Sequence, residues 1–192
     1  MKQLLIFALA LLTASFTTDE TQQATVKKVS GKYVFYYNEP VQPYETVFTF
    51  TTTYPALKKG HCYTIAGTAD LLMRSAMTEA GAQAKQFDAI IITHGQRDLA
   101  VKFKTDTIIN NLAVVEKTQS KSVFTFCEPV KQYDVVESIK VRRGDPITGE
   151  CRQQHKIVEM TLKDAEKSAK KGKSYDAIIQ SDNENHLSIK FK

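Results

Sequence analysis

An internal repeat is the feature that most constrains how this chain can fold. The segment Tyr33–Glu45 reads YVFYYNEPVQPYE, and Ser122–Asp134 reads SVFTFCEPVKQYD. Farther along, FDAII at Phe87–Ile91 returns as YDAII at Tyr175–Ile179. The matching segments keep the same order, and the offset of 89 residues shortens only to 88 in the last pair. Such regular self-similarity is typical of a duplicated structural unit.

The repeat sets the domain organisation. We predict repeat one at residues 24–104, a joint at 105–112 and repeat two at 113–192. A total length of 192 residues agrees with one or two domains. A repeat of about 80 residues is near the lower practical size for an independent core. Packing of one copy on the other should therefore stabilise both.

Each copy has the same expected order of elements. Runs rich in β-branched and aromatic residues predict strands. A stripe of small residues indicates a helix after the second strand, and polar turn residues join the last two strands into a hairpin. The expected strands cover 32–37, 44–53, 88–93 and 99–104 in repeat one, and 121–126, 133–141, 176–180 and 187–192 in repeat two. The predicted fold class is α+β, with two tandem ββαββ repeats, each a small, mostly antiparallel sheet covered by one helix.

Local signals place the ends of some elements. Glu39-Pro40 and Glu128-Pro129 should end the first strand of each copy, because proline lacks the N–H that a strand ladder needs. In repeat two, Thr161 and Asp164 have the spacing of a capping box, which predicts the first turn of the helix there. Gly172 is the expected stop of that helix.

The first residues have the layout of a secretory signal. Lys2 supplies a positive charge, Leu4–Leu12 is an unbroken apolar run, and small residues follow at Ala14 and Ser15. The run is too short to span a bilayer, which takes about twenty residues. We predict a signal peptide over 1–15 and an exported protein, periplasmic or extracellular, without stable membrane insertion.

Composition narrows the function classes. Hydrophobic residues make up 42% and charged residues 24%, which is ordinary globular usage. The net charge of +5 is spread along the chain, so we expect no nucleic-acid partner. Neither a Gly-rich nucleotide loop nor a Gly-x-Ser-x-Gly elbow occurs. We therefore expect no cofactor and no enzymatic activity.

The repeated residues also resemble a known family. The pattern combines Tyr44-Glu45-Thr46-Val47 at the start of the second strand with Phe87–Ile91 after the helix. Repeat two has Tyr133–Val136 and Tyr175–Ile179 at the same places. This resembles the YbjQ-like "heavy-metal-binding" domains and the related fold of the Rcs stress-sensor lipoprotein. The resemblance implies a small βαβ module in each repeat and, through the family's name, metal binding. Phe48 and Glu137 stand where the family usually has Gly, and no metal-ligand motif matches.

Three cysteines leave two pairings open. In an oxidising compartment two of the three would pair. Cys127–Cys151 would lie within repeat two, and Cys62–Cys151 would join equivalent positions of the two repeats. We slightly favour Cys127–Cys151 because both residues fall early in one unit, although sequence does not determine connectivity.

Two sets of residues are candidate sites. The duplicated Glu-Pro-x-x-x-Tyr pattern suggests a shared binding surface made of Glu39, Pro40, Tyr44, Glu128, Pro129 and Tyr133. The alternative is a metal cluster across the two repeats made of His61, Cys62, Cys151 and His155. Neither His-x₃-His nor Cys-x₂-Cys spacing occurs, so the usual zinc pattern is missing.

Three functions from different classes follow. The first is an exported, non-enzymatic tandem binding or scaffold module of the cell envelope, whose partner is an envelope protein or a surface polymer. The second is a metal-binding envelope protein. The third is a small hydrolase that uses duplicated loop carboxylates such as Asp88 and Asp176. The sequence leaves the oligomeric state open.

Overall fold

The structure is a computed structural model that describes residues 19–58, 60–95, 97–104 and 111–192. The predicted signal peptide, 1–15, and most of the predicted joint lie outside the described residues. Below, the first half means residues 19–104 and the second half means residues 111–192.

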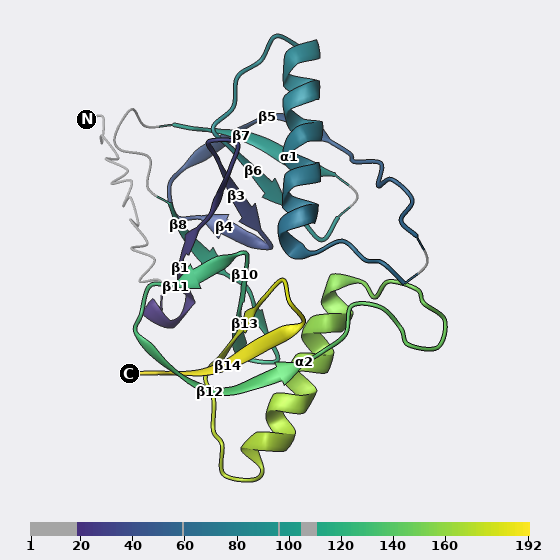
Figure 1. The fold of residues 1–192 in the computed structure, drawn as a ribbon. Coiled ribbons are helices and arrows are strands. Elements are labelled where there is room, and N and C mark those ends of the chain that lie inside the picture. The colour runs from purple at the N-terminus through teal and green to yellow at the C-terminus, as the bar shows by residue number, and fades with distance from the viewer. Residues whose placement is uncertain (1–18, 59, 96, 105–110) are drawn as a thin grey trace, which may run out of the picture.

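The described chain is a mixed α+β fold with two helices and three sheets of mostly antiparallel strands (Figure 1). A short 3₁₀ helix, η1 (Glu20–Gln22), precedes the first strand. The first half contains β1 (Gln23–Val26), β2 (Lys28–Val29), β3 (Lys32–Tyr36), β4 (Asn38–Pro40), β5 (Tyr44–Phe50), α1 (Ile65–Ala82), β6 (Ala89–Ile92) and β7 (Asp98–Phe103). The second half contains β8 (Leu112–Val115), β9 (Lys117–Thr118), β10 (Lys121–Thr125), β11 (Cys127–Pro129), β12 (Tyr133–Lys140), α2 (Gln154–Ala169), β13 (Ala177–Gln180) and β14 (Asn185–Phe191).

The central sheet interlocks the two halves. Its strand order is β11-β1-β8-β4, and all its pairs are antiparallel. The first half supplies β1 and β4, which hold β8 between them, while the second half supplies β8 and β11, which hold β1 between them. The two central strands of each half therefore enclose one central strand of the other half. Neither half contains a complete central sheet.

Matched positions of the repeat meet at the junction. In the central sheet Ala24 lies opposite Ala113. Asn38 donates from Nδ2 to the Cys127 sulfur at 3.6 Å, across 89 residues of sequence. This is the arrangement expected of two copies related by an approximate twofold axis.

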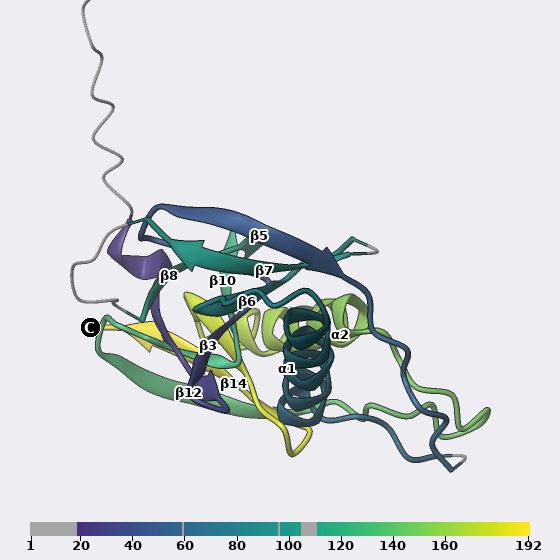
Figure 2. The ribbon, with the colours of Figure 1, turned by 90° about the horizontal axis from the view of Figure 1, so that it is seen from above.

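A second sheet in each half carries a helix. The strand orders are β2-β3-β6-β7-β5 and β9-β10-β13-β14-β12, with β3·β6 and β10·β13 as the parallel pairs. Because side chains alternate across a strand, the two faces of each sheet contribute buried side chains to two different cores. In β3, Val34 and Tyr36 pack toward α1, whereas Phe35 packs toward the centre. Figure 2 shows the same layers from above.

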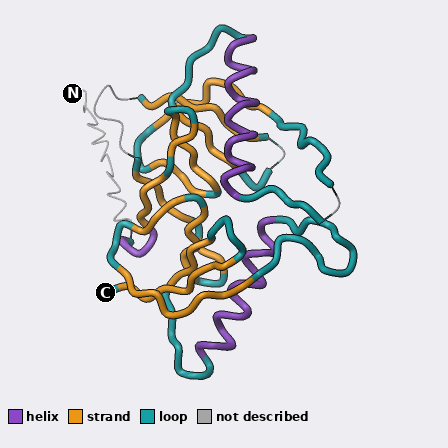
Figure 3. Tube along the Cα trace, in the orientation of Figure 1, coloured by secondary structure: helices purple, strands orange, loops and turns teal. Residues whose placement is uncertain are grey.

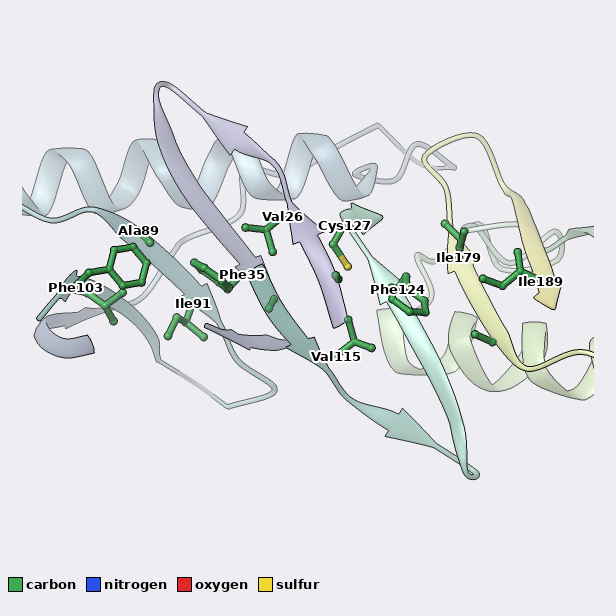
Figure 4. Close-up of a cluster of buried hydrophobic side chains, with 14 residues drawn as sticks. Val26, Phe35, Ala89, Ile91, Phe103, Val115, Phe124, Cys127, Ile179 and Ile189 are labelled. Carbon is green, nitrogen blue, oxygen red and sulfur yellow. The ribbon is translucent and has the colours of Figure 1, made fainter. Parts of the chain in front are cut away.

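The central core receives matching residues from both halves. Phe35 and Phe124 are fully buried in it, together with Val26, Val115 and the free cysteine Cys127 (Figure 4). Two further cores lie between α1 and its sheet and between α2 and its sheet. The shared core therefore joins the two halves into one folding unit.

The predicted ββαββ order is incomplete. The expected helix of the first half is present, and so are its strands expected at 32–37, 44–53, 88–93 and 99–104, three of them shorter and the last shifted by one residue. The short strands β1, β2 and β4 of the first half, and their counterparts in the second, were not expected. The Glu-Pro segments lie inside two of them, β4 and β11, which are the edge strands of the central sheet. Proline is tolerated there because one side of an edge strand needs no partner.

The start of α2 was predicted wrongly. The helix begins at Gln154, so Thr161 lies in its interior and its hydroxyl donates to the Ile157 carbonyl at 2.8 Å. The capping-box pattern at Thr161 and Asp164 is therefore coincidental. The helix ends at Ala169 with Lys170 as its C-cap, and Gly172 lies in the turn that follows, with a φ of 94° that favours glycine.

Both helices begin near the junction and run away from it, so their N-termini face the contact between the halves (Figures 1 and 3). Neither helix in the described part of the chain has the length and apolar character needed to cross a membrane.

Candidate binding site at the junction of the two halves

A disulfide closes the junction beside the helix N-termini. It joins Cys62 to Cys151, with a Cα–Cα distance of 5.6 Å. The amide of Gly60 donates to the carbonyl of Gly149 at 3.2 Å next to it, and both glycines have positive φ values of 83° and 72°. Only glycine adopts this conformation without steric cost, so the chain can turn sharply before each of the two cysteines.

The slightly favoured pairing, Cys127–Cys151, is wrong. Cys127 lies in β11 within the central core, whereas Cys151 lies at the disulfide with Cys62. Burial raises the pKa of the Cys127 thiol to about 12, so it stays protonated and unreactive at neutral pH. The disulfide that forms is the inter-repeat alternative. It is consistent with an extracytoplasmic location.

The four residues of the predicted metal cluster, His61, Cys62, Cys151 and His155, do not form a set of metal ligands in the structure. Both sulfur atoms are bonded to each other, so neither is available as the thiolate that binds metals. Among the described residues no group of three or more His, Cys, Asp or Glu side chains is placed to hold a metal ion.

The predicted Glu-Pro-Tyr surface is divided between two places. Glu39 and Pro40 lie in β4, and Glu128 and Pro129 lie in β11, at opposite edges of the central sheet. The Tyr44 hydroxyl donates to Glu39 at 2.8 Å. Tyr44 and Tyr133 also pack against the central core. These six residues therefore form two matched edge regions rather than one site.

A pocket with a volume of about 590 Å³ lies at the junction. We call it the junction pocket. Its lining residues are Tyr36, Tyr37, Tyr54, Cys62, Tyr63, Thr68 and His94 from the first half, and Arg143, Cys151, Arg152, Gln153, Gln154 and His155 from the second. The volume is in the range of small-molecule sites. None of these lining residues is acidic.

The first half supplies an aromatic wall. The ring of His94 stacks on that of Tyr37 with centroids 3.9 Å apart, and its Nε2 lies 2.8 Å from Glu116. Tyr54 and Tyr63 meet edge to face at 5.7 Å. Burial raises the pKa of Tyr37 to about 12, so its hydroxyl stays neutral. Tyrosine rings of this kind offer flat apolar faces with polar tips.

The second half supplies a cationic wall. Arg143 is only 6% exposed, and its guanidinium donates to Gln154 Oε1 at 3.3 Å and to the Ser181 carbonyl at 3.2 Å. Both acceptors are neutral, and Arg143 Nε has no partner. Arg152 is different, because it pairs with Asp145 at 3.0 Å.

A buried polar network supports this wall. Gln154 donates to Gln180 Oε1 at 2.7 Å, and Thr125 donates to the same atom at 2.6 Å. At the matched positions of the first half the residues are Ile65, Ile92 and Tyr36. The same framework is thus apolar beside α1 and polar beside α2.

Sequence reasoning missed this site because it looked for residues that the two copies share. The informative signal was the reverse, namely positions where the copies differ most in chemistry. Tyr54 matches Arg143, and Tyr63 matches Arg152. A pseudo-symmetric molecule can have a site on only one side if the residues at duplicated positions differ.

His186 lies beneath the network and is fully buried. Its Nδ1 accepts from the Ser181 amide at 3.2 Å, and its Nε2 has no partner. Burial and the nearby charge of Arg143 lower the pKa of His186 to about 4, while Glu184 acts in the opposite direction. The neutral imidazole is therefore the native form.

This predicts a specific loss of stability in acid. Above pH 6.5 His186 is neutral in both the folded and the unfolded chain. Between pH 6.5 and about 4 only the unfolded chain binds the proton, so the free energy of unfolding falls by up to about 1.4 kcal/mol per pH unit. Urea unfolding at pH 7, 6, 5 and 4.5 measures this slope. His186→Gln should flatten it, and equal slopes in both proteins would rule out His186 as the cause.

The duplicated carboxylates have structural partners. Asp88 accepts from the Phe103 amide at 3.0 Å, and Asp176 accepts from the Phe191 amide at 2.9 Å. Each holds the corner where the chain enters the sheet. The described lining residues of the junction pocket also include no acid. The hydrolase hypothesis therefore lacks the paired carboxylates that it needs there.

No protein-family model, curated protein or solved structure matches this chain. The resemblance to the "heavy-metal-binding" domains therefore stays a prediction. The interpretation of the site depends on its own geometry.

Proposed function

We propose that this protein is an exported, non-enzymatic binding module of the cell envelope, and that its ligand occupies the junction pocket. The ligand is a small molecule, or a terminal group of an envelope protein or surface polymer. The observation that carries the proposal is the pocket itself. It is of small-molecule size, both halves line it, and a disulfide holds it.

The lining is suited to binding a ligand. Its tyrosines, glutamines and arginines can stack on a ring and donate hydrogen bonds. The described lining contains no carboxylate to act as a base and no free thiol to act as a nucleophile. The secretory layout of the first residues and the disulfide both support export.

Ligand-observed NMR on the mature, oxidised chain tests the proposal. The probes are benzoate, benzamide, glucuronate and glucose, which separate ring type from charge. Tyr54 is 49% exposed and lines the pocket, so Tyr54→Ala removes a stacking surface with little effect on the core. We expect the dissociation constant of a bound probe to rise roughly fivefold, which corresponds to about 1 kcal/mol of lost stacking.

Val135→Ala is the matched control, because Val135 is 55% exposed and is not among the residues that line the pocket. It should leave probe binding unchanged. Binding of none of the four probes, or equal losses in the two variants, would argue against a ligand in the junction pocket.

A further inference from the structure

The N-terminus of α1 shows how this molecule satisfies a helix end at the junction. Thr64 accepts from the Gly67 amide at 2.9 Å. Asp182, which comes from the opposite half, accepts from the Ala66 amide at 2.9 Å. A carboxylate at this place is favourable because the free N–H groups carry the positive end of the helix dipole. The first helix thus has an internal anion.

The N-terminus of α2 lacks that anion. Gln153 takes the place of Thr64 and gives no side-chain hydrogen bond to the helix. The position that matches Asp182 is His94, two residues after the end of β6. Within the described chain, the amide of His155, which matches Ala66, has no acceptor. This end of α2 opens into the junction pocket, which Gln153, Gln154 and His155 line.

A second and independent observation also points to an absent anion. Arg143 lines the same pocket and is 6% exposed. Among the described residues its guanidinium donates only to the neutral Gln154 and Ser181, while Asp182 and Glu184 act on it without a direct ion pair. Its Nε has no acceptor, and neither does the Nε2 of the neighbouring Gln180. The carboxylates of Asp182 and Glu184 compensate the charge of Arg143 only in part, because burial still lowers the pKa of the guanidinium. The polar network beside α2 therefore has donors in excess of acceptors.

We propose that the junction pocket binds a carboxylate carried on a ring, with the carboxylate at the N-terminus of α2 and within reach of Arg143. There it takes the place that Asp182 takes at α1. The ring of the ligand lies against the tyrosine wall. This inference rests on the proposed function and names the chemical class of its ligand.

Both parts of the ligand follow from the wall that each would touch. A carboxylate accepts in the plane of a guanidinium and from helix amides, which Arg143 and the His155 amide supply. Tyr37 and Tyr54 offer ring faces for an aromatic group or a sugar. An aromatic carboxylate and a uronate share this chemistry, and the probes distinguish them.

The first test compares each acid with its neutral counterpart in titrations of the ¹⁵N-labelled mature protein. Benzoate or glucuronate should bind at least tenfold more tightly than benzamide or glucose, and should shift the His155 amide. Whichever acid binds more tightly identifies the ring. Equal binding of acid and neutral probe would overturn the carboxylate site while leaving a ligand in the pocket. Failure of all four probes would instead remove the proposed function.

The second test builds the internal anion into the pocket. His94→Asp places a carboxylate at the position that matches Asp182, and His94→Asn has the same shape without charge. Both variants also carry Glu116→Gln, because Glu116 lies 2.8 Å from His94 Nε2 and would repel the new acid. The Asp variant should bind the acidic probe at least tenfold more weakly than the Asn variant, and should melt at a higher temperature. Equal affinities in the two variants would overturn the proposal.

Discussion

An isolated first half of the chain, residues 19–104, is expected not to fold as a monomer. β1 pairs with β8 on one side and with β11 on the other, and both partners belong to the second half. β4 pairs with β8 alone. Removing the second half therefore leaves every central strand of the first half without a partner.

The core explains why the remaining sheet and helix do not compensate. Phe35, Ala89 and Ile91 face the central core, where about half of the buried side chains come from the other half. Exposing that face costs roughly 25 cal/mol for each Å² of apolar surface. The net stability of a native protein is only about 5–15 kcal/mol, so exposing roughly 400 Å² of apolar surface, at a cost of about 10 kcal/mol, would remove most of it.

Circular dichroism and ¹⁵N-HSQC spectra of the isolated half should be those of an unfolded chain. Mixing it with residues 111–192 should restore the dispersed spectrum of the full chain. This control shows whether the isolated half fails to fold because its partner strands are missing. A second copy of the first half could also supply the missing strand, since Ala24 would then meet its own equivalent as it now meets Ala113. A stable, folded monomer of residues 19–104 would contradict the interlocked central sheet.

The sequence predicted those parts of the fold that depend on local pattern. The strand at Lys32–Tyr36 and the Asp-Ala-Ile-Ile segments were predicted correctly because β-branched and aromatic residues alternate between two cores there. The central sheet was missed because its strands are short, and Gln23–Val26 has no run long enough to show a period. Glu39-Pro40 looked like a strand end, because an edge position cannot be recognised before the partner strands are known.

The site could be predicted only in part, for a related reason. The sequence brought Cys62, Cys151 and His155 together as neighbours across the two copies, and all three line the junction pocket. It left both a metal site and a Cys62–Cys151 disulfide open for the two cysteines, because a disulfide and a thiolate metal site call for the same residue, and the structure has the disulfide. Arg143 was not considered at all, since its burial follows from the packing of Gln154 and Ser181 around it and not from its neighbours in sequence.

Replacing the disulfide, by Cys62→Ser with Cys151→Ser, is expected to lower the free energy of unfolding by about 4 kcal/mol. The bond spans 89 residues, so its main effect is to restrict the unfolded chain, and this effect grows with the size of the closed loop. It also ties the turns at Gly60 and Gly149 together, where a single backbone hydrogen bond of 3.2 Å would otherwise hold them. Urea unfolding of both proteins under oxidising conditions measures the difference.

Reduction of the wild-type protein should reproduce the same loss, and the reducing agent should leave the double serine variant unchanged, which separates the disulfide from the serine side chains. A loss below about 1 kcal/mol would mean that the unfolded chain already keeps these turns close. The bond also lies in the wall of the junction pocket, where Tyr63 and Arg152 follow its two cysteines in sequence. Because preorganisation lowers the cost of binding, the variant should bind the ring carboxylate more weakly even where it remains folded. The covalent link between matched cysteines thus fixes both the stability of the junction and the shape of the pocket that two unlike halves form there.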